Sequence, residues 1–408
     1  MKKLFLSTIA LYVAVLQAFS QSAPTEATTY QYKPLSLEEI NLTSSYYTQN
    51  GNHSAVTGGI GSEKVVDFSN GFDLQFIGWD GFSRKHTLTT GLGIDYHSSA
   101  SSAWVSETGA SKKGGTRIYP SLNWTMEDLK KGTTVGAGLY YSAEYNYHSF
   151  GINAEYAKKN KKNGELSDKL NIFLDRVTMI YPTELASDYL PTTVVYSGAS
   201  GSSSEGGSGL PKSGRYTFSN SLTYSQVINK RLQGSLTLDL VGQGGYLGLP
   251  FHRVYFSNTL ERVEALPSER FKLPVGARLN YFIGDNIILR GYYRYYIDDW
   301  GITAHTASLE VPVKITPFFS VAPFFRYYTQ TQSNYFAPYM QHKLTDQYYT
   351  SNYAYAAFSS NYFGVNLRIA PPNGLFKSKL SALEIRYGHY TQTTDLLSDV
   401  LSVDLKFK

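Results

Sequence analysis

Charged side chains in the second half of the chain fall repeatedly at every other position, with aliphatic or aromatic residues between them. Side chains alternate between the two faces of a β-strand, so this spacing places the charges together on one face. Basic side chains gathered on one wall attract anions, and carboxylates among them can form ion pairs. We expect nine residues to form this charged face: Arg278, Arg290, Arg294, Glu310, Lys314, Arg326, Arg368, Glu384 and Arg386.

The histidines and the acidic loop residues are the other candidates for chemistry. A hydrolase needs a nucleophile, a base and an orienting group that converge in space. The histidines are scattered, and the serines that follow His53 and His97 do not make a triad by adjacency, so we expect no enzyme and no cofactor. Glu63, Asp298 and Asp299 carry the oxygen ligands that calcium prefers, but turn formation explains them equally well.

The charged face is clearest in the segment 287–330, which we divide into three strands by turns at 298–301 and 316–317. In the first strand, Arg290 and Arg294 lie on one face, and the residues between them are aliphatic or aromatic. The rest of the chain repeats this two-residue alternation. The pattern therefore indicates a sheet with one polar and one apolar face.

The composition also favours strands. Among 408 residues there are 35 Tyr and 35 Gly but only 4 Met, and hydrophobic residues make up 42%. Beyond the N-terminus no run of 18 apolar residues occurs, so we expect no transmembrane helix. The absence of Cys excludes disulfides, thiol nucleophiles and Cys-ligated metals. Loss of Lys2 and Lys3 would lower the net charge from +5 to +3, which is too small a bias to imply nucleic acid as a partner.

The N-terminus has the pattern of a secretory signal peptide. Two lysines, an apolar stretch and small residues follow one another within residues 1–20, so we expect cleavage between Ser20 and Gln21. The alternative reading is a membrane anchor or a core helix. Residues 21–39 are polar and are expected to be a periplasmic tail, and residues 40–408 are expected to form one domain.

An exported chain with this alternation fits an all-β fold, a transmembrane antiparallel up-and-down β-barrel in the bacterial outer membrane. The alternative is a secreted soluble β-protein. We expect about 16 strands, with 14 also possible, and short turns after even strands alternating with longer loops after odd ones. The expected strands are about 40–49, 65–79, 84–96, 116–126, 133–142, 149–157, 170–180, 215–228, 234–242, 271–282, 288–297, 308–315, 321–328, 357–369, 380–390 and 400–407.

The charged face must then point into the barrel. A Lys or Arg that faces lipid near the bilayer midplane costs about 2–4 kcal/mol, and several such costs would exceed the stability of most domains. A barrel of this size can hold an aqueous interior, and a positive lumen favours anionic solutes. The alternative is that Arg290 pairs with Glu310 and Arg326 pairs with Glu384 inside a plugged barrel.

These two readings give two functions. The first is a porin-like, passive or weakly selective channel for small, perhaps anionic, solutes. The second is a barrel that acts as a membrane scaffold for a periplasmic or outer-membrane complex, because the Gly-rich loop 50–63 and the Tyr-rich loop 331–352 fold inward and close the pore.

Several aromatic residues are expected on the lipid-facing side, in the interfacial girdles of the barrel. These are Trp124, Tyr293, Tyr295, Tyr327, Tyr387 and Phe407. Phe407 resembles the terminal aromatic residue that the barrel-assembly machinery reads, although Lys408 follows it here. The expected partners are therefore outer-membrane lipid, that machinery and small solutes.

Three segments together resemble a known family: GNHSAVTGGIGSEKV (51–65), IDYHSSASS (94–102) and the long segment YYRYYIDDWGITAHTASLEVPVKITPFFSVAPFFRYYTQTQSNYFAPY (292–339). They are similar to exported proteins, common in Bacteroidota, that are known only as domain-of-unknown-function family number 3570. The resemblance implies an outer-membrane barrel and supplies no substrate, cofactor or catalytic residue. The usual gene neighbourhood of the family would imply a redox-linked periplasmic partner protein.

Overall fold

The structure is a computed structural model that describes residues 32–98, 114–182, 184–190, 210–375 and 378–408. The signal peptide expected at the N-terminus lies outside these residues, as does most of the tail expected to follow it. No helix of the described residues is long and apolar enough to cross a membrane.

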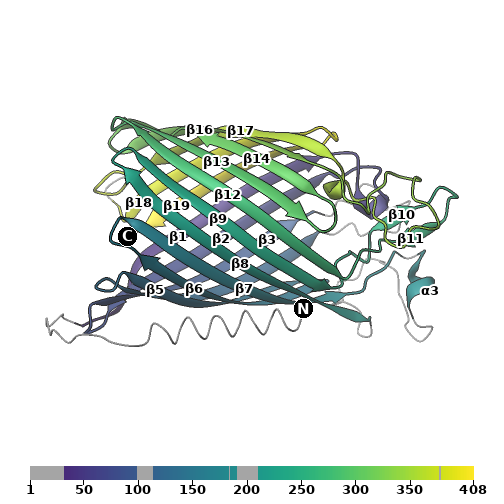
Figure 1. Ribbon diagram of the computed structural model, residues 1–408, viewed down its shortest axis with the longest axis horizontal. Coiled ribbons are helices and arrows are strands. Elements are labelled where there is room, and N and C mark those ends of the chain that lie inside the picture. Colours follow the sequence, from purple (N-terminus) through teal and green to yellow (C-terminus); the bar gives the residue numbers. More distant parts are fainter. Residues whose placement is uncertain (1–31, 99–113, 183, 191–209, 376–377) are drawn as a thin grey trace.

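One antiparallel sheet closes on itself to form a barrel, because the first strand pairs with the last as well as with the second. Two of its segments, β14 and β15, are parts of one passage, so the barrel has 16 strands and the expected count is confirmed. Figure 1 shows the strands running obliquely along the barrel. The strands are β1 (Lys33–Asn50), β2 (Val65–Trp79), β3 (Arg84–His97), β4 (Gly115–Asp128), β5 (Thr133–Glu144), β6 (Tyr147–Lys159), β7 (Gly164–Thr178), β8 (Lys212–Asn229), β9 (Leu232–Gly245), β12 (Glu269–Ile283), β13 (Ile287–Asp298), β14 (Thr303–Glu310), β15 (Val313–Thr316), β16 (Phe319–Gln330), β17 (Phe358–Ile369), β18 (Leu380–Gln392) and β19 (Leu397–Phe407).

The first strand begins earlier than expected. Residues 33–39 belong to β1 rather than to a tail, and Lys33 lies opposite Trp79 of β2. The ladder there shifts register twice, which is why the two-residue alternation does not extend into this part of the sequence. The expected tail is therefore wrong for residues 33–39.

The strand expected at 170–180 also begins earlier, at Gly164. Asn160 builds a tight turn before it, because its side-chain oxygen accepts the backbone N–H groups of Lys162 and Gly164, at 2.8 Å each. Asn163 completes the turn with φ of 60°. Asn tolerates this left-handed conformation better than most residues, so the turn needs fewer residues than we expected.

The strand expected at 308–315 is interrupted at Val311 and Pro312. Proline has no N–H to donate to the ladder, so the regular pairing of β14 stops before it. The carbonyl of Pro312 still accepts the N–H of Ile288 at 3.0 Å, and β15 continues the passage.

The two ends of the barrel differ. At one end, the turn end, consecutive strands are joined by short connections such as 80–83 and 284–286. At the other, the loop end, the connections include 51–64, 246–268 and 331–357. These loops gather on the right of Figure 1 with the small strands β10 (Arg253–Tyr255) and β11 (Glu261–Val263), and the C-terminus lies at the opposite end. The predicted difference between the two ends holds for these loops, whereas the loop-end connections 145–146, 299–302 and 393–396 are as short as turns.

The outward face of the sheet is apolar. Leucine, isoleucine, phenylalanine and tyrosine side chains are exposed on neighbouring strands all round the barrel; examples are Leu42, Phe72, Leu92, Leu122, Leu139, Ile152, Leu238, Leu279, Leu309, Phe325, Phe363 and Leu401. Such a continuous exposed belt would be unstable in water but is what a bilayer solvates. The chain is therefore a transmembrane β-barrel. Of the six aromatic residues expected on this face, Trp124, Tyr293, Tyr327 and Tyr387 are exposed, whereas Tyr295 and Phe407 are only partly exposed.

Neighbouring positions on β4 test which face meets lipid. Leu122 is 43% exposed on the outward face, whereas Ser121 lines an interior cavity. We expect Leu122→Arg to destabilise the folded barrel by about 2–4 kcal/mol, because the guanidinium would face the acyl chains. Ser121→Arg should cost much less. Urea unfolding in lipid vesicles measures both, and equal effects would contradict the assignment of the two faces.

Candidate functional site

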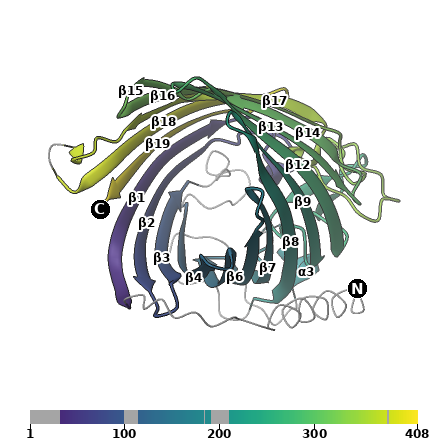
Figure 2. The same cartoon turned by 60° about the vertical axis from the view of Figure 1, so that its left-hand side comes forward.

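Two cavities hollow the inner wall of the barrel. Figure 2 shows how the strands curve round to form this wall. One cavity, of about 600 Å³, is lined by residues of β13, β14, β16, β17 and β18. The other, of about 590 Å³, is lined by residues of β4 to β9. We call them the C-terminal cavity and the N-terminal cavity. Both are formed by the polar face of the sheet, because the alternating apolar residues point to lipid.

The C-terminal cavity brings together four of the nine predicted residues: Arg294, Glu310, Arg326 and Arg386. They lie on four different strands. The antiparallel register places them at a similar height along the barrel, so their side chains line the same cavity. Arg290 is directly opposite Glu310 in the ladder, next to the cavity. Three of these four side chains are positive, so they form a positive wall at this cavity.

Carboxylates neutralise part of this wall. Arg290 Nη1 is 2.8 Å from Glu310 Oε1, and Arg386 Nη1 is 3.5 Å from Glu310 Oε2. Arg294 Nη2 is 3.6 Å from Oδ2 of Asp239, which comes from β9. Positive charge remains in excess, because Glu310 serves two arginines and Arg326 has no acidic partner in the described part of the chain.

The remaining predicted residues lie outside this cavity. Arg278 lines a smaller neighbouring cavity with Arg294. Arg368 Nε is 2.7 Å from Glu384 Oε1, so the alternative pairing of Arg326 with Glu384 is wrong. Lys314 belongs to β15, and no ion pair to it occurs among the described residues.

Two arginines are held against aromatic rings instead. The guanidinium carbon of Arg386 lies 4.0 Å from the ring centre of Phe324, and that of Arg326 lies 4.9 Å from the ring centre of Tyr362. The two rings contact each other, with centres 5.1 Å apart. Cation–π contact of this kind is favourable and restrains the guanidinium beside the ring.

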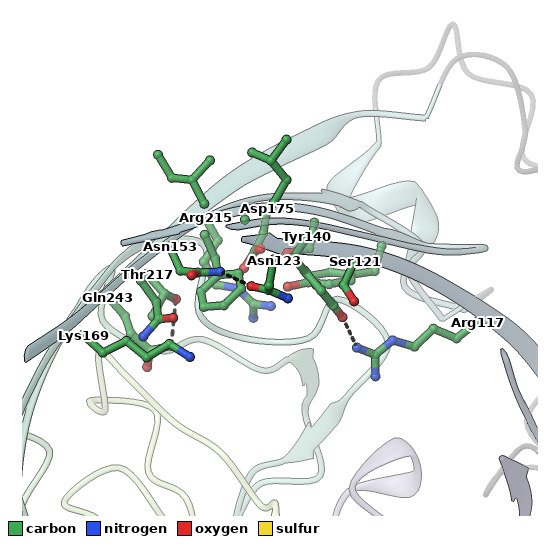
Figure 3. A pocket seen from close by; sticks show the side chains of 17 residues that line it. Arg117, Ser121, Asn123, Tyr140, Asn153, Lys169, Asp175, Arg215, Thr217 and Gln243 are labelled. Carbon is green, nitrogen blue, oxygen red and sulfur yellow. Dashed lines mark hydrogen bonds and ion pairs between the residues drawn. The ribbon is translucent and has the colours of Figure 1, made fainter. Parts of the chain in front are cut away.

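The N-terminal cavity also carries an excess of positive charge, because three cations and one carboxylate line it. Figure 3 shows its labelled side chains projecting from one side of the wall, with Arg117 reaching Tyr140 and Arg215 reaching Asp175. Arg117 Nη2 donates to Tyr140 Oη at 2.7 Å, and Arg215 Nε donates to Asp175 at 2.9 Å. The remaining lining is largely amide and hydroxyl, and Lys169 is its other cation.

The sequence prediction did not include Arg117, Lys169 or Arg215. The signal in the sequence was weak, because each stands at or beside the start of an expected strand and follows Thr116, Asp168 or Gly214 rather than a large apolar residue. Asp239 and the supporting rings of Phe324 and Tyr362 were also missed. Their roles depend on pairing between strands, which one strand's alternation does not specify.

Four connections at the loop end fold together into one structure, which we call the cap. It comprises 51–64, the described parts of 179–190, 246–268 and 331–357. The loop after β1 and the loop after β9 leave the barrel half a ring apart, because eight strand-to-strand steps separate them in either direction around the sheet. Contacts between them therefore cross the mouth of the barrel.

Arg253 makes the central contact of this crossing and is only 4% exposed. Its Nη1 donates to the backbone carbonyl of Val56 at 2.6 Å. Its Nε lies 2.5 Å from Glu184 Oε1 and 3.2 Å from Glu261 Oε1. One buried guanidinium thus joins segments that follow three different barrel strands.

The two loops that we expected to fold inward also meet. The rings of His53 and Tyr353 stack with centres 3.8 Å apart, and a Cβ at Gly59 would lie 2.6 Å from the carbonyl oxygen of Ser351. Gly59 has φ of 87°, so glycine is required there both by conformation and by the close approach.

The cap has an apolar core of its own. Val254 and Phe256 are almost completely buried and pack with Tyr349 and Ala265. Most of the buried hydrophobic residues among those described lie in the cap rather than in the barrel strands. The cap is therefore a folded structure, because it is the part of the molecule that excludes water from apolar side chains as a soluble domain does.

A buried carboxylate ties this core together. The Thr350 hydroxyl donates to Glu264 Oε1 at 2.5 Å, and the backbone N–H of Leu249 donates to Oε2 at 2.9 Å. His252 Nδ1 lies 3.5 Å from the same Oε2. Burial by itself raises the pKa of Glu264, but His252 and the two hydrogen bonds outweigh it and hold the pKa below its ordinary value.

The acidic residues that could hold calcium are used by the fold itself. Asp298 accepts the N–H groups of Trp300 and Ile302 at 3.1 and 2.9 Å and pairs with Arg270. Glu63 accepts the N–H of His53 at 2.7 Å. Across the described ranges, no cluster of three or more metal-ligating side chains occurs.

A closed antiparallel sheet with a lipid-facing exterior and a polar, arginine-bearing interior defines this protein as a transmembrane barrel. The sequence profile described as "Protein of unknown function (DUF3570)" matches residues 94–397. The chain belongs to this family, as the segments within 94–102 and 292–339 predicted.

Comparison with solved structures finds other barrels at low sequence identity. OpdQ of Pseudomonas aeruginosa is 9% identical with a TM-score of 0.41, and the match covers 93% of this chain and 98% of that one. The outer membrane protein OprD of Pseudomonas aeruginosa is 9% identical with a TM-score of 0.42, covering 93% and 96%. A bacterial polysaccharide outer membrane secretin is 9% identical with a TM-score of 0.43, covering 90% and 98%. No curated protein matches the chain.

We expect Glu264→Gln to loosen the cap without unfolding the barrel. The amide offers one acceptor where the carboxylate offers two, so one buried donor loses its partner at a cost of about 1–3 kcal/mol. Hydrogen exchange of amides in 246–268 should accelerate, while the heat-modifiable gel mobility of the barrel stays unchanged.

The same carboxylate predicts the pH dependence of the cap. The pKa of Glu264 is lower in the folded cap than in the unfolded chain. Glu264 therefore contributes fully to the stability of the cap above the ordinary carboxyl pKa of about 4.3, and this stability is lost as the pH falls below it. Exchange in 246–268 should therefore accelerate on acidification in the natural chain and much less in Glu264→Gln. Equal acid responses in the two proteins would contradict the role of Glu264.

Proposed function

We propose that the protein is an outer-membrane channel of the porin type, which passes small solutes and favours anions. The observation that carries this proposal is the excess of arginine over carboxylate around the C-terminal cavity, on a wall that water rather than lipid must solvate. Fixed positive charge lining an aqueous path raises the local concentration of anions.

The orientation and partners belong to the same proposal. Residues 1–20 direct export and are removed near Ser20 and Gln21, the loop end with its cap faces outward, and both chain ends lie in the periplasm. Phe407 serves the barrel-assembly machinery, and the lipid-facing belt contacts outer-membrane lipid. A periplasmic partner protein would dock at the turn end.

The channel is tested by conductance of the purified, refolded mature chain in planar bilayers. We expect steady openings whose reversal potential under a salt gradient indicates anion preference. Replacing Arg290, Arg294 and Arg326 together by Gln should move the reversal potential towards zero or cation preference, because it removes three positive charges and leaves Asp239 without its arginine.

A matched control removes three positive charges from the turn end: Lys161, Lys162 and Lys230, all exposed, are replaced by Gln. This variant should keep the anion preference of the natural chain. Absence of any conductance, from a barrel that gel mobility shows to be folded, would rule the channel out.

The second candidate function is a capped barrel that acts as a membrane scaffold for a complex. The specific observation in its favour is the folded cap, in which Arg253 connects loops from opposite sides of the mouth. An open channel does not require a folded cap with a buried core across its entrance. A scaffold does benefit from one, because the cap presents a rigid surface to which a partner protein can bind.

Shortening the loop after β1 separates the two candidates. Replacing 53–61 by a short Gly-Ser linker removes the Val56 carbonyl that Arg253 binds and the bridge across the mouth. We expect conductance to rise, because the mouth becomes wider. Equal conductance of the natural chain and the variant would mean that the cap leaves the path through the barrel open. No conductance in either protein would favour the scaffold.

A further inference from the structure

The C-terminal cavity contains a row of side chains that charge alone does not explain, with two neighbouring rings between two arginines. Arg386 lies over Phe324, Phe324 contacts Tyr362 at a tilt of 47°, and Arg326 lies over Tyr362. These residues come from β16, β17 and β18, so the row is built across three strands. Phe324 is 8% exposed and is therefore covered, whereas Arg326 at the end of the row is exposed to the cavity.

Arg326 differs from the arginines around it in what it binds. Arg294 has Asp239 as a partner, and Arg386 has Glu310. No hydrogen bond or ion pair of the Arg326 side chain occurs within the part of the chain that the structure describes, and its guanidinium lies over the ring of Tyr362. The donors of the guanidinium are therefore available, and the contact with the ring restrains it.

Aromatic rings surround the space beside Arg326. Tyr292, Tyr328, Phe358 and Tyr390 all line the same cavity. The hydroxyls of Tyr328 and Tyr390 donate to Gln330 and Gln392, at 2.6 Å each, so these two side chains are fixed within the wall. A restrained guanidinium fork beside fixed rings suits a ligand with a carboxylate at one end and a planar apolar body.

We infer that the C-terminal cavity is a binding site for small aromatic carboxylates. The carboxylate accepts the paired N–H groups of Arg326, and the ring of the ligand packs among the tyrosines. The inference deepens the proposed function, because it names the class of solute that the positive wall selects. It rests on the proposed function only in assuming that the ligand passes through the barrel. Binding itself does not require the barrel to conduct.

Calorimetry on the refolded full barrel in detergent tests the ligand class with three probes of similar size. Benzoate has the charge and the planar ring, cyclohexanecarboxylate has the charge and a puckered ring, and benzamide has the planar ring without the charge. We expect benzoate to bind at least tenfold more tightly than either of the others. Equal binding of the two carboxylates would show attraction to charge alone and would overturn the inference.

Variants locate the site. Arg326→Gln should weaken benzoate binding at least tenfold, and Arg326→Lys should also weaken it, because lysine keeps the charge but lacks the planar fork. Arg117→Gln is the matched control: Arg117 also lies over a tyrosine, Tyr119, at 4.9 Å, but lines the N-terminal cavity. It should bind benzoate as the natural chain does. Gel mobility confirms that each variant is folded.

The outcomes separate this inference from the proposed function. Benzoate binding that depends on Arg326, in a barrel without conductance, would support the site and remove the channel. Anion-selective conductance without benzoate binding would support the channel and overturn the site. Equal losses of binding in the Arg326 and Arg117 variants would also overturn it, because they would indicate a diffuse attraction by the whole inner wall.

Discussion

The cost of placing charge or an unpaired backbone group in lipid governs this structure. Every barrel strand must hydrogen-bond to two neighbours, which only a closed sheet provides, and every charged side chain in the membrane must point inward. The pairing of β1 with β19 satisfies the first requirement, and the two-residue alternation satisfies the second. The arginine wall is thus a consequence of the lipid on the other side as much as of the solute.

Water-excluding packing is concentrated at one end of the molecule. The barrel has lipid outside and polar side chains inside, so its strands contribute few buried apolar residues, whereas the cap buries Val254, Phe256 and Tyr349 together. The cap also buries charge, at Arg253 and Glu264, and pairs both. Such pairs add little net stability but penalise any arrangement that separates them, which suits a structure that must have one shape.

The sequence predicted the fold closely because alternation, turn residues and loop lengths are local properties. The turn at 298–301 is an example: Asp298 caps the N–H groups that follow it, as its side chain does in many turns. The start of β1 and the cap were not predictable in this way. Bulges break the alternation near Lys33, and the contact of Arg253 with Val56 joins residues far apart in the chain.

The seam between the two terminal strands has a consequence for how the protein comes into being. Ile40 lies opposite Phe407, and the hydroxyl of Thr43 donates to Asp404 at 2.6 Å, so the first strand is completed only by the last. A chain without its final strand would leave the edges of β1 and β18 unpaired in lipid. Assembly is therefore all-or-none with respect to chain length: a premature stop anywhere before β19 yields no smaller working barrel, only exposed sheet edges that favour aggregation.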